Sequence, residues 1–211
     1  AERERLCRTD ILIIGGGAID AGLEAEIRQL PGKVYSTYGM TETLSHIALR
    51  RLNGPDASTL YYPFPSVRLS LSPEHTLIID APLVCDTILV TNDVAEINSD
   101  GSFSILGRKD NTINTGGIKV QAEQGEDILR PWIHVPFAIT SVSDAALGEA
   151  VVLLIENGGY TERLEEKMKE LLTKYQLPKM VFSVGTIPLT ETGKINRAGC
   201  RQLAATYQVG R

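Results

Sequence analysis

Four short motifs place glycine beside hydroxyl, carboxylate or ammonium groups, a combination suited to phosphate chemistry. The first, Gly15-Gly16-Gly17-Ala18, lets a flat ligand approach the backbone, because glycine has no Cβ. The second, Tyr38-Gly39-Met40-Thr41-Glu42-Thr43, offers Thr41 as a donor to a phosphate oxygen and Glu42 as a ligand for Mg²⁺. Each also has a plain structural explanation: a tight turn for the first, and a polar helix start capped by Thr41 or Thr43 for the second.

The other two motifs lie further along the chain. Thr91-Asn92-Asp93 is followed by Gly107-Arg108-Lys109-Asp110. A carboxylate at a strand end can accept hydrogen bonds from a ribose diol, and a nearby arginine adds contacts to sugar or phosphate. In the run 188–197, the glycine before Lys194 lets the ammonium swing into a closed site and neutralise charge developing on oxygen. Taken singly, these residues have ordinary explanations: a turn residue for Asp93, a solvated loop charge for Asp110 and a basic surface loop for Lys194.

Predicted strands and a helix position the first two motifs. The run Ile11–Ile14 is apolar and rich in β-branched residues, so it predicts a strand that ends at the glycines. Leu23, Ile27 and Leu30 share one face of the helix expected next, and Val34–Tyr38 predicts a second strand. A strand–helix–strand unit of this length is typical of a parallel sheet, with binding groups on loops at the carboxyl ends of the strands.

Short strands follow from about residue 60. The apolar runs at 77–79, 87–90 and 103–106 are separated by turn residues and predict a small antiparallel sheet or barrel. Beyond Asp110 the sequence predicts both strands and helices, with a strand at 151–155 and a helix that starts at Thr161. The apolar stripe expected on this helix consists of Leu164, Met168, Leu171, Leu172 and Tyr175. The sequence therefore predicts an α/β part followed by a smaller α+β domain.

Composition and charge limit the partners. The 211 residues are 43% hydrophobic with a net charge of -5, which allows a buried core and argues against nucleic acid or anionic membrane as the main partner. No apolar run approaches the ~20 residues needed to span a bilayer. Three well-separated cysteines favour a reducing cytoplasm. The whole net charge falls on residues up to Asp110, which marks a candidate boundary there.

Together, in this order, the motifs resemble those of the adenylate-forming superfamily of acyl- and aryl-CoA synthetases, luciferases and peptide-synthetase adenylation domains. Tyr38–Thr43 is similar to the family's Tyr-Gly-x-Thr-Glu loop, and Thr91–Asp93 to its Thr-Gly-Asp, with Asn92 in place of glycine. Gly107–Lys119 resembles its Gly-Arg-x-Asp…Gly-Gly-x-Lys stretch, and Thr190–Arg197 its closing Thr-x-Gly-Lys-x-x-Arg. The resemblance implies that residues 1–109 form the C-terminal portion of the large AMP-binding domain, as strand–helix–strand plus a barrel-like part. Residues 110–211 would form its small, mobile α+β C-terminal domain.

The resemblance also implies a nucleotide site. The residues expected to line or flank the adenine are Gly16, Gly17, Ala18, Tyr38 and Gly39. Thr41 would touch the α-phosphate, Glu42 would bind Mg²⁺, and Asp93 with Arg108 would hold the ribose hydroxyls. Lys194 would stabilise the adenylation transition state, so Lys194, Thr41 and Glu42 are the predicted catalytic residues.

A second set of roles concerns the small domain. Asp110 would be the hinge about which it rotates. That rotation would bring the Lys194 loop to the site for the first step and the Gly116-Gly117 loop for the second. Lys119 would then lie near phosphate or the CoA channel.

The implied reaction joins a carboxylic acid to CoA. The acid and ATP, with Mg²⁺, would give an acyl-adenylate and pyrophosphate, and CoA would displace AMP to form a thioester. Gly15–Gly17 with Thr37–His46 resembles most the o-succinylbenzoate–CoA ligases of menaquinone synthesis. Other acyl- or aryl-CoA synthetases, a domain that loads a carrier protein, and a non-enzymatic binding module are the alternatives. A homo-oligomer is compatible with the sequence.

One family feature has no counterpart here. Nothing in the chain matches the Ser/Thr/Gly-rich, lysine-containing phosphate loop that the family carries well upstream of the position of Gly15. The resemblance therefore implies a C-terminal fragment of a longer ligase. On its own such a fragment is expected to bind ATP weakly and to turn nothing over.

Overall fold

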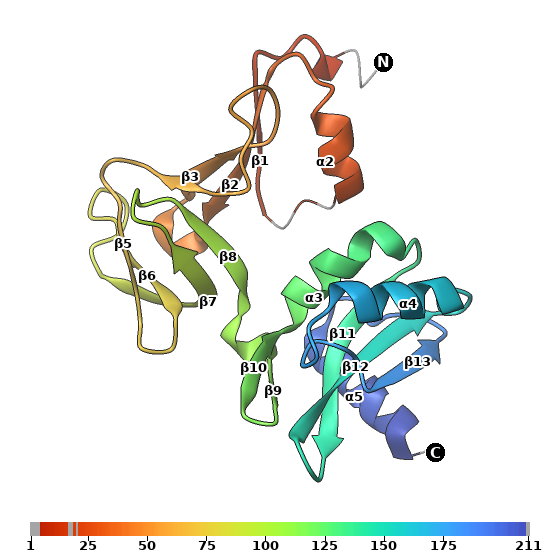
Figure 1. Ribbon diagram of the computed structural model, residues 1–211. Coiled ribbons are helices and arrows are strands. Elements are labelled where there is room, and N and C mark those ends of the chain that lie inside the picture. The colour runs from red at the N-terminus through yellow and green to blue at the C-terminus, as the bar shows by residue number, and fades with distance from the viewer. Residues whose placement is uncertain (1–4, 17–18, 20, 210–211) are drawn as a thin grey trace. The chain divides into compact units, whose positions relative to one another are not determined.

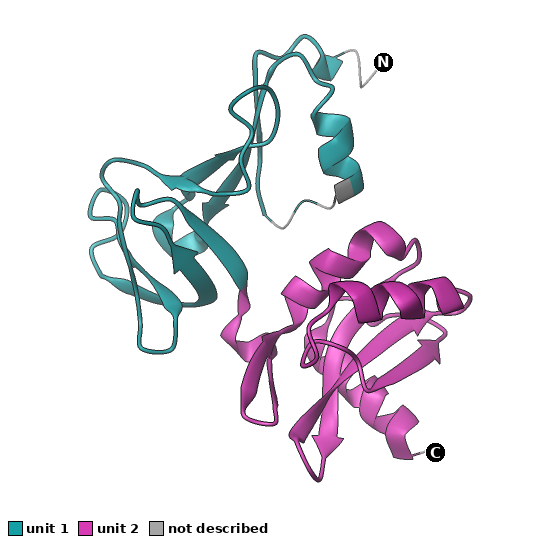
Figure 2. Ribbon diagram, viewed as in Figure 1, with its two compact units in different colours: residues 1–106 teal, residues 107–211 magenta. Residues whose placement is uncertain are grey.

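The computed structural model describes residues 5–16, 19 and 21–209, which divide into two units between Leu106 and Gly107 (Figure 2). Unit 1 comprises the residues up to Leu106, and unit 2 those from Gly107 onward. The division falls at the start of the Gly107–Asp110 motif. None of the helices in the described ranges has both the length and the apolar character needed to cross a membrane.

A mixed four-stranded sheet begins unit 1. Its strands, in spatial order, are β1 (Ile11–Ile14), β2 (Lys33–Gly39), β3 (His46–Arg51) and β4 (Tyr62–Pro63) (Figure 1). Strands β1 and β2 pair in parallel and are joined through helix α2 (Ala21–Ile27), which confirms the predicted strand–helix–strand unit. Strands β3 and β4 add to it antiparallel, so the expectation of a parallel sheet is correct only for the first pair.

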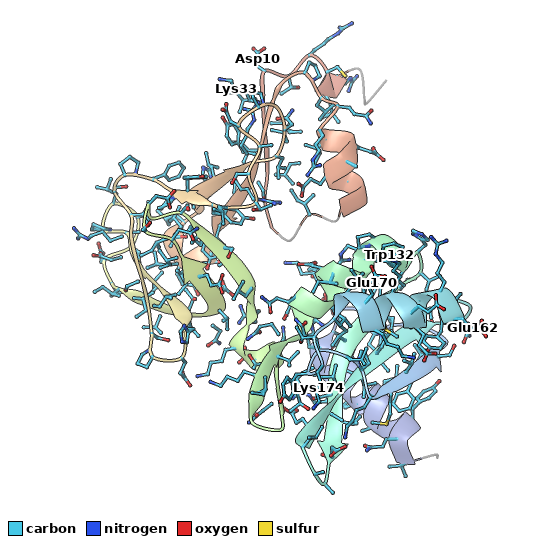
Figure 3. The ribbon with its side chains drawn as sticks, in the orientation of Figure 1. Asp10, Lys33, Trp132, Glu162, Glu170 and Lys174 are labelled. Carbon is cyan, nitrogen blue, oxygen red and sulfur yellow. The ribbon has the colours of Figure 1, made fainter. Side chains whose placement is uncertain are left out.

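Helix α2 is shorter than its sequence pattern suggested. Ile27 is buried with Val34 and Leu52, but Leu23 is 45% exposed and Leu30 lies beyond the end of the helix. Only part of the predicted apolar face therefore packs inside unit 1. The chain returns directly to β2, where the N–H of Lys33 donates to the carbonyl of Asp10 at 2.7 Å, and both residues are labelled in Figure 3.

The second sheet of unit 1 matches the predicted run of short strands. It contains, in order, β5 (Arg68–Leu71), β6 (Thr76–Asp80), β7 (Leu89–Ile97) and β8 (Phe103–Arg108). The pairs β5–β6 and β6–β7 are antiparallel. Leu77, Ile79 and Phe103 share a buried core with Ile47 of β3, which joins this sheet to the first.

Unit 2 is built on a five-stranded sheet of order β10-β9-β12-β11, in which β13 also pairs with β12. The strands are β9 (Thr112–Thr115), β10 (Ile118–Gln121), β11 (Phe137–Asp144), β12 (Gly148–Glu156) and β13 (Met180–Val184). Its helices are α3 (Ala122–Leu129), α4 (Glu162–Leu171) and α5 (Arg197–Val209). Alternate residues of β12 serve two cores: Val151 and Leu153 pack with α3 and α4, while Val152 and Leu154 pack with α5.

Helix α4 begins where the sequence predicts and ends earlier. Thr161 caps it, because its Oγ1 accepts the N–H of Leu164 at 3.2 Å. The last helical residue is Leu171, and Lys174 lies beyond that end, opposite Glu162 at the start (Figure 3). Leu171, the last helical residue, is 37% exposed, and Tyr175, beyond the end, is 44% exposed. The predicted stripe is therefore wrong for these two residues.

Candidate nucleotide and catalytic sites

Strands β2 and β7 bring two of the motifs together in unit 1. The hydroxyl of Tyr38 donates to Asp93 Oδ2 at 2.6 Å, although the residues are 55 positions apart. The backbone N–H of Asp93 donates to Thr91 Oγ1 at 3.1 Å. Asp93 lies within β7, so the prediction that it stands at a strand end was wrong, and the residue is partly buried.

An aromatic cluster fixes the ring of Tyr38. Its ring packs edge-on against Phe103 with centroids 5.4 Å apart, and 6.0 Å from Tyr61. The Tyr61 hydroxyl hydrogen-bonds Ser36 Oγ at 3.0 Å, and the Arg50 guanidinium lies 5.7 Å from the Tyr61 ring. Tyr61 and Phe103 were not among the predicted site residues, because neither belongs to a motif and the sheet topology is what brings them to Tyr38.

The loop after β2 forms a 3₁₀ turn, η1 (Thr41–Thr43), in which Thr43 is the anchor. The N–H of Met40 donates to Thr43 Oγ1 at 3.1 Å, and that hydroxyl lies 3.0 Å from the carbonyl oxygens of Met40 and Ser45. The cap position belongs to Met40, so neither threonine begins the turn as an N-cap. Thr43 is buried, while Thr41 and Glu42 are exposed, which leaves their hydroxyl and carboxylate accessible to a ligand.

Glu42 suits a magnesium ion carried by a nucleotide. Among the described residues no group of three or more His, Cys, Asp and Glu could hold a metal by itself. Mg²⁺ keeps several waters and is commonly bound through one or two carboxylates plus substrate phosphates. One exposed carboxylate beside a threonine hydroxyl fits that second mode.

Two glycines near these loops are constrained differently, Gly16 by its backbone conformation and Gly39 by packing. Gly17 and Ala18 lie outside the described residues. Gly16 is exposed at φ +91°, a conformation that favours glycine. A Cβ on Gly39 would fall 2.0 Å from the carbonyl oxygen of Ser45. Packing against the loop therefore explains Gly39 without any ligand.

The segment at the start of unit 2 is short and exposed. Arg108 Nη2 lies 3.4 Å from Asp110 Oδ2, and their side chains are 52% and 61% exposed. Asp110 is the middle residue of a second 3₁₀ turn, η2 (Lys109–Asn111). A pair this open to water contributes little to stability.

The strands β9 and β10 form a hairpin with Gly116 and Gly117 at its tip. Both glycines have positive φ, +60° and +82°, as a two-residue type I′ turn requires. The N–H of Gly116 donates to the carbonyl of Leu147 at 2.8 Å. Lys119 follows on β10, opposite Asn114, with its side chain exposed.

Lys194 lies on a closed loop that precedes α5. Leu189 and Ile195 form a β-bridge at its base, and the N–H of Thr190 donates to the Lys194 carbonyl at 2.7 Å. The Lys194 N–H donates to Thr190 Oγ1 at 3.1 Å, and Gly193 completes the turn at φ +78°. The backbone at Lys194 is thus fixed while its side chain is exposed.

A buried ion pair in unit 2 was not among the predicted site residues. Arg197 Nη1 and Nη2 donate to Glu126 Oε1 and Oε2 at 2.5 and 2.8 Å. Burial raises the pKa of Glu126, and the charge and hydrogen bonds of Arg197 oppose that shift. The signal was present, since Arg197 ends the Thr190–Arg197 motif, but its partner on α3 lies 71 positions away.

The predicted residues therefore fall into two groups. Of the described residues predicted to bind nucleotide or metal, unit 1 carries Gly16, Tyr38, Gly39, Thr41, Glu42 and Asp93. Unit 2 carries the remaining predicted residues: Arg108, Asp110, Gly116, Gly117, Lys119 and Lys194. Within unit 1, the contact between Tyr38 and Asp93 joins two motifs directly through their side chains.

Comparison with known proteins identifies relatives of this chain. No protein-family model matches the chain. The 2-succinylbenzoate–CoA ligase of Lactococcus lactis is 26% identical over 204 residues, which cover 89% of this chain and 45% of that protein. The structure of an acyl-CoA synthetase (AMP-forming)/AMP-acid ligase II-like protein from Dyadobacter fermentans is 32% identical, with a TM-score of 0.50 over 92% of this chain and 58% of that one.

A further solved structure shows the fold. It is the o-succinylbenzoate coenzyme A synthetase of Bacillus subtilis in complex with ATP and magnesium, which matches with a TM-score of 0.73 at 20% identity. The match covers 93% of this chain and 48% of that one. The chain spans about half the length of the curated relatives it matches. It is a homologue of the 2-succinylbenzoate–CoA ligases and other adenylate-forming enzymes, and it corresponds to the C-terminal part of their length.

Proposed function

We propose that this chain provides the C-terminal part of an ATP-dependent acid–CoA ligase. In the reaction, a carboxylate attacks the α-phosphorus of ATP to give an acyl-adenylate and pyrophosphate, and the CoA thiol then displaces AMP to leave a thioester. The hydrogen bond between Tyr38 and Asp93 carries the proposal, because it joins two separate nucleotide motifs at one place. A reducing cytoplasm is the proposed location, since the three cysteines are all free.

Unit 1 would hold the nucleotide. Asp93, whose carboxylate is oriented by Tyr38, would accept hydrogen bonds from the ribose hydroxyls. The Tyr38 ring, held by its aromatic neighbours, would support the adenine, with Gly16 and Gly39 beside it. The exposed Thr41 would donate to the α-phosphate, and Glu42 would bind Mg²⁺, which neutralises phosphate charge when bound.

Unit 2 would supply the groups that alternate between the two steps. Lys194, on a loop fixed at its base, would offset negative charge that develops at the α-phosphate during adenylation. Arg108 would add to the ribose contacts. Asp110 would act as the hinge, and the Gly116-Gly117 turn with Lys119 would serve the CoA step.

The acid substrate we propose is o-succinylbenzoate. The support is the name of the Lactococcus relative, which aligns with 89% of this chain. A ligase for a different acyl or aryl acid, or an enzyme that loads a carrier protein, would share the same nucleotide residues. The choice therefore depends on which acid, and which thiol, is accepted.

Substitution of Lys194 in the full-length protein tests the proposal. With o-succinylbenzoate, benzoates and fatty acids each supplied in turn, we expect AMP and pyrophosphate release with the first acid and free CoA. Lys194→Ala should lower the adenylation rate by about 10²–10³-fold, because it removes one preorganised charge. Lys174→Ala, an exposed lysine beyond α4, is the matched control and should leave the rate unchanged. Full activity of Lys194→Ala would contradict the assigned chemistry, and release only with another acid would change the substrate.

A further inference from the structure

An ion pair joins α3 to α5, and its arginine, Arg197, lies three residues after Lys194. Arg197 is the first residue of α5, and its guanidinium contacts both carboxylate oxygens of Glu126 on α3. The side chain of Glu126 is only 3% exposed. A bidentate arginine–carboxylate pair constrains direction as well as distance. It therefore fixes where α5 starts relative to α3.

Strand β11 is part of the same connection. Arg197 Nη1 donates to the carbonyl of Ile139 at 3.2 Å, and the Ile139 N–H donates to Glu126 Oε1 at 2.8 Å. Both backbone groups of one residue in the central sheet are thus used by the pair. Because the carboxylate is buried, loss of Arg197 would leave a desolvated charge without its main partner.

The start of α5 is continuous with the base of the Lys194 loop. The N–H of Asn196 donates to the carbonyl of Pro188 at 2.9 Å, and Asn196 Oδ1 accepts the N–H of Gly199 at 3.0 Å. The bridge between Leu189 and Ile195 comes next. Any shift of Arg197 would therefore displace Asn196 and, through it, both arms of the loop.

We propose that Arg197 and Glu126 are positioning residues for Lys194. They hold the base of its loop against α3 and β11, so that the ammonium reaches the reacting phosphate from one fixed place. This inference rests on the proposed function, since it assigns to Lys194 the charge-neutralising role in adenylation. Misplacement of a reacting group by about 1 Å can cost on the order of 100-fold in rate.

Paired substitutions in the full-length protein separate positioning from stability. Arg197→Met alone leaves Glu126 buried without its partner, whereas Glu126→Leu with Arg197→Met removes both charges at similar volume. Arg197 Nη2 also lies 3.5 Å from Glu123 Oε1, so both variants remove that ion pair as well. For the double variant we expect a lower urea midpoint than the parent's, because the buried N–H and carbonyl of Ile139 lose these partners. We also expect a kcat for adenylation lowered about 10–100-fold and a KM for ATP changed less than about twofold. Met168→Ala, which opens the core shared by α3 and α4 without removing either charge, is the control: it should lower the midpoint and spare kcat.

Adding Lys194→Ala to the double variant tests directly whether the ion pair acts through Lys194. If the pair acts through Lys194, the double variant should cause no further loss of rate in the Lys194→Ala background. A parental kcat in the double variant, or losses that multiply with that of Lys194→Ala, would overturn the inference.

Hydrogen exchange provides a readout that does not depend on activity. The amides of Thr190, Lys194 and Asn196 donate within the loop, and in the double variant they should exchange at least about tenfold faster, while that of Leu154 in β12 stays protected. Unchanged loop exchange would refute the positioning role even if the protein is an active ligase. If the parent forms no adenylate with any acid, the proposed function fails, and the exchange data still decide whether the pair holds this loop.

Discussion

At the residue scale, Tyr38 contributes twice to the proposed nucleotide site. Its ring is wedged against Phe103, and its hydroxyl makes a 2.6 Å hydrogen bond to the Asp93 carboxylate. Because the ring is held, the hydroxyl can orient the carboxylate at little further cost in entropy. Hydrogen bonds to ionised groups are worth about 1.5–3 kcal/mol, enough to change nucleotide affinity by tenfold or more.

The change Tyr38→Phe isolates that hydroxyl. We expect the KM for ATP of the full-length protein to rise about tenfold, because Asp93 loses its orienting donor while the aromatic packing remains. Tyr61→Phe is the matched control, since it removes a hydrogen bond to Ser36 in the same cluster without touching Asp93. ATP affinity measured by steady-state kinetics and by calorimetry should separate the two variants. Equal effects of both would mean that the cluster, and not the Tyr38 hydroxyl, controls binding.

At the element scale, the backbone conformation of the β9–β10 turn favours glycine at both positions of the Gly116-Gly117 motif. Gly116 and Gly117 both occupy the left-handed region, and a Cβ on Gly117 would meet nothing within 4 Å. The cost of any other residue at Gly117 is therefore conformational and not steric. Asparagine tolerates this region better than alanine does.

We therefore expect alanine at position 117 to lower the stability of unit 2 more than asparagine does. Gly117→Ala is expected to lower the free energy of unfolding of unit 2 by about 1–2 kcal/mol, and Gly117→Asn by less than about 1 kcal/mol. Urea denaturation followed by circular dichroism checks this prediction. Gly185→Ala, at a position with negative φ and an equally open Cβ site, should change stability by less than either. Equal losses for Gly117→Ala and Gly117→Asn would show that the turn is not type I′.

The elements differ in how far the sequence could predict them. The strand at Ile11–Ile14 and the start of the helix after Thr161 follow local rules, an apolar β-branched run and an N-cap, and both are found where predicted. Strand β3 was not predicted, because 46–51 ends in two arginines, and their partners, Glu24 for Arg50 and the Tyr35 ring for Arg51, are known only from the fold. The exposure of Tyr175 follows from where α4 ends, which depends on the turn after it and not on periodicity. The contact between Glu126 and Arg197 could not be predicted from the sequence, because these residues are 71 positions apart and meet only once the sheet of unit 2 has formed.

At the scale of the whole molecule, the division into two units coincides with a stretch that has no apolar side chains. The core of unit 1 includes Phe103 with Ile105 packed against it, and the first buried core residue of unit 2 is Ile113. Residues 107–112 consist of glycine, charged and polar residues. Opening this segment would therefore expose little apolar surface, whereas a break inside either unit would disrupt a core.

Limited trypsin digestion tests that difference. A protease needs several residues to unfold locally, and its rate follows the free energy of that opening. Arg108 is the last residue of β8, Lys109 is the first of the 3₁₀ turn η2, and both are exposed. Cleavage after them should therefore be at least about tenfold faster than at any other site and should release two fragments that then persist. Mass spectrometry of early digests identifies the cuts. Replacing both with glutamine should abolish the early fragments and leave the later pattern unchanged, while first cuts within α4 or β6–β7 would show that the units do not part at this segment.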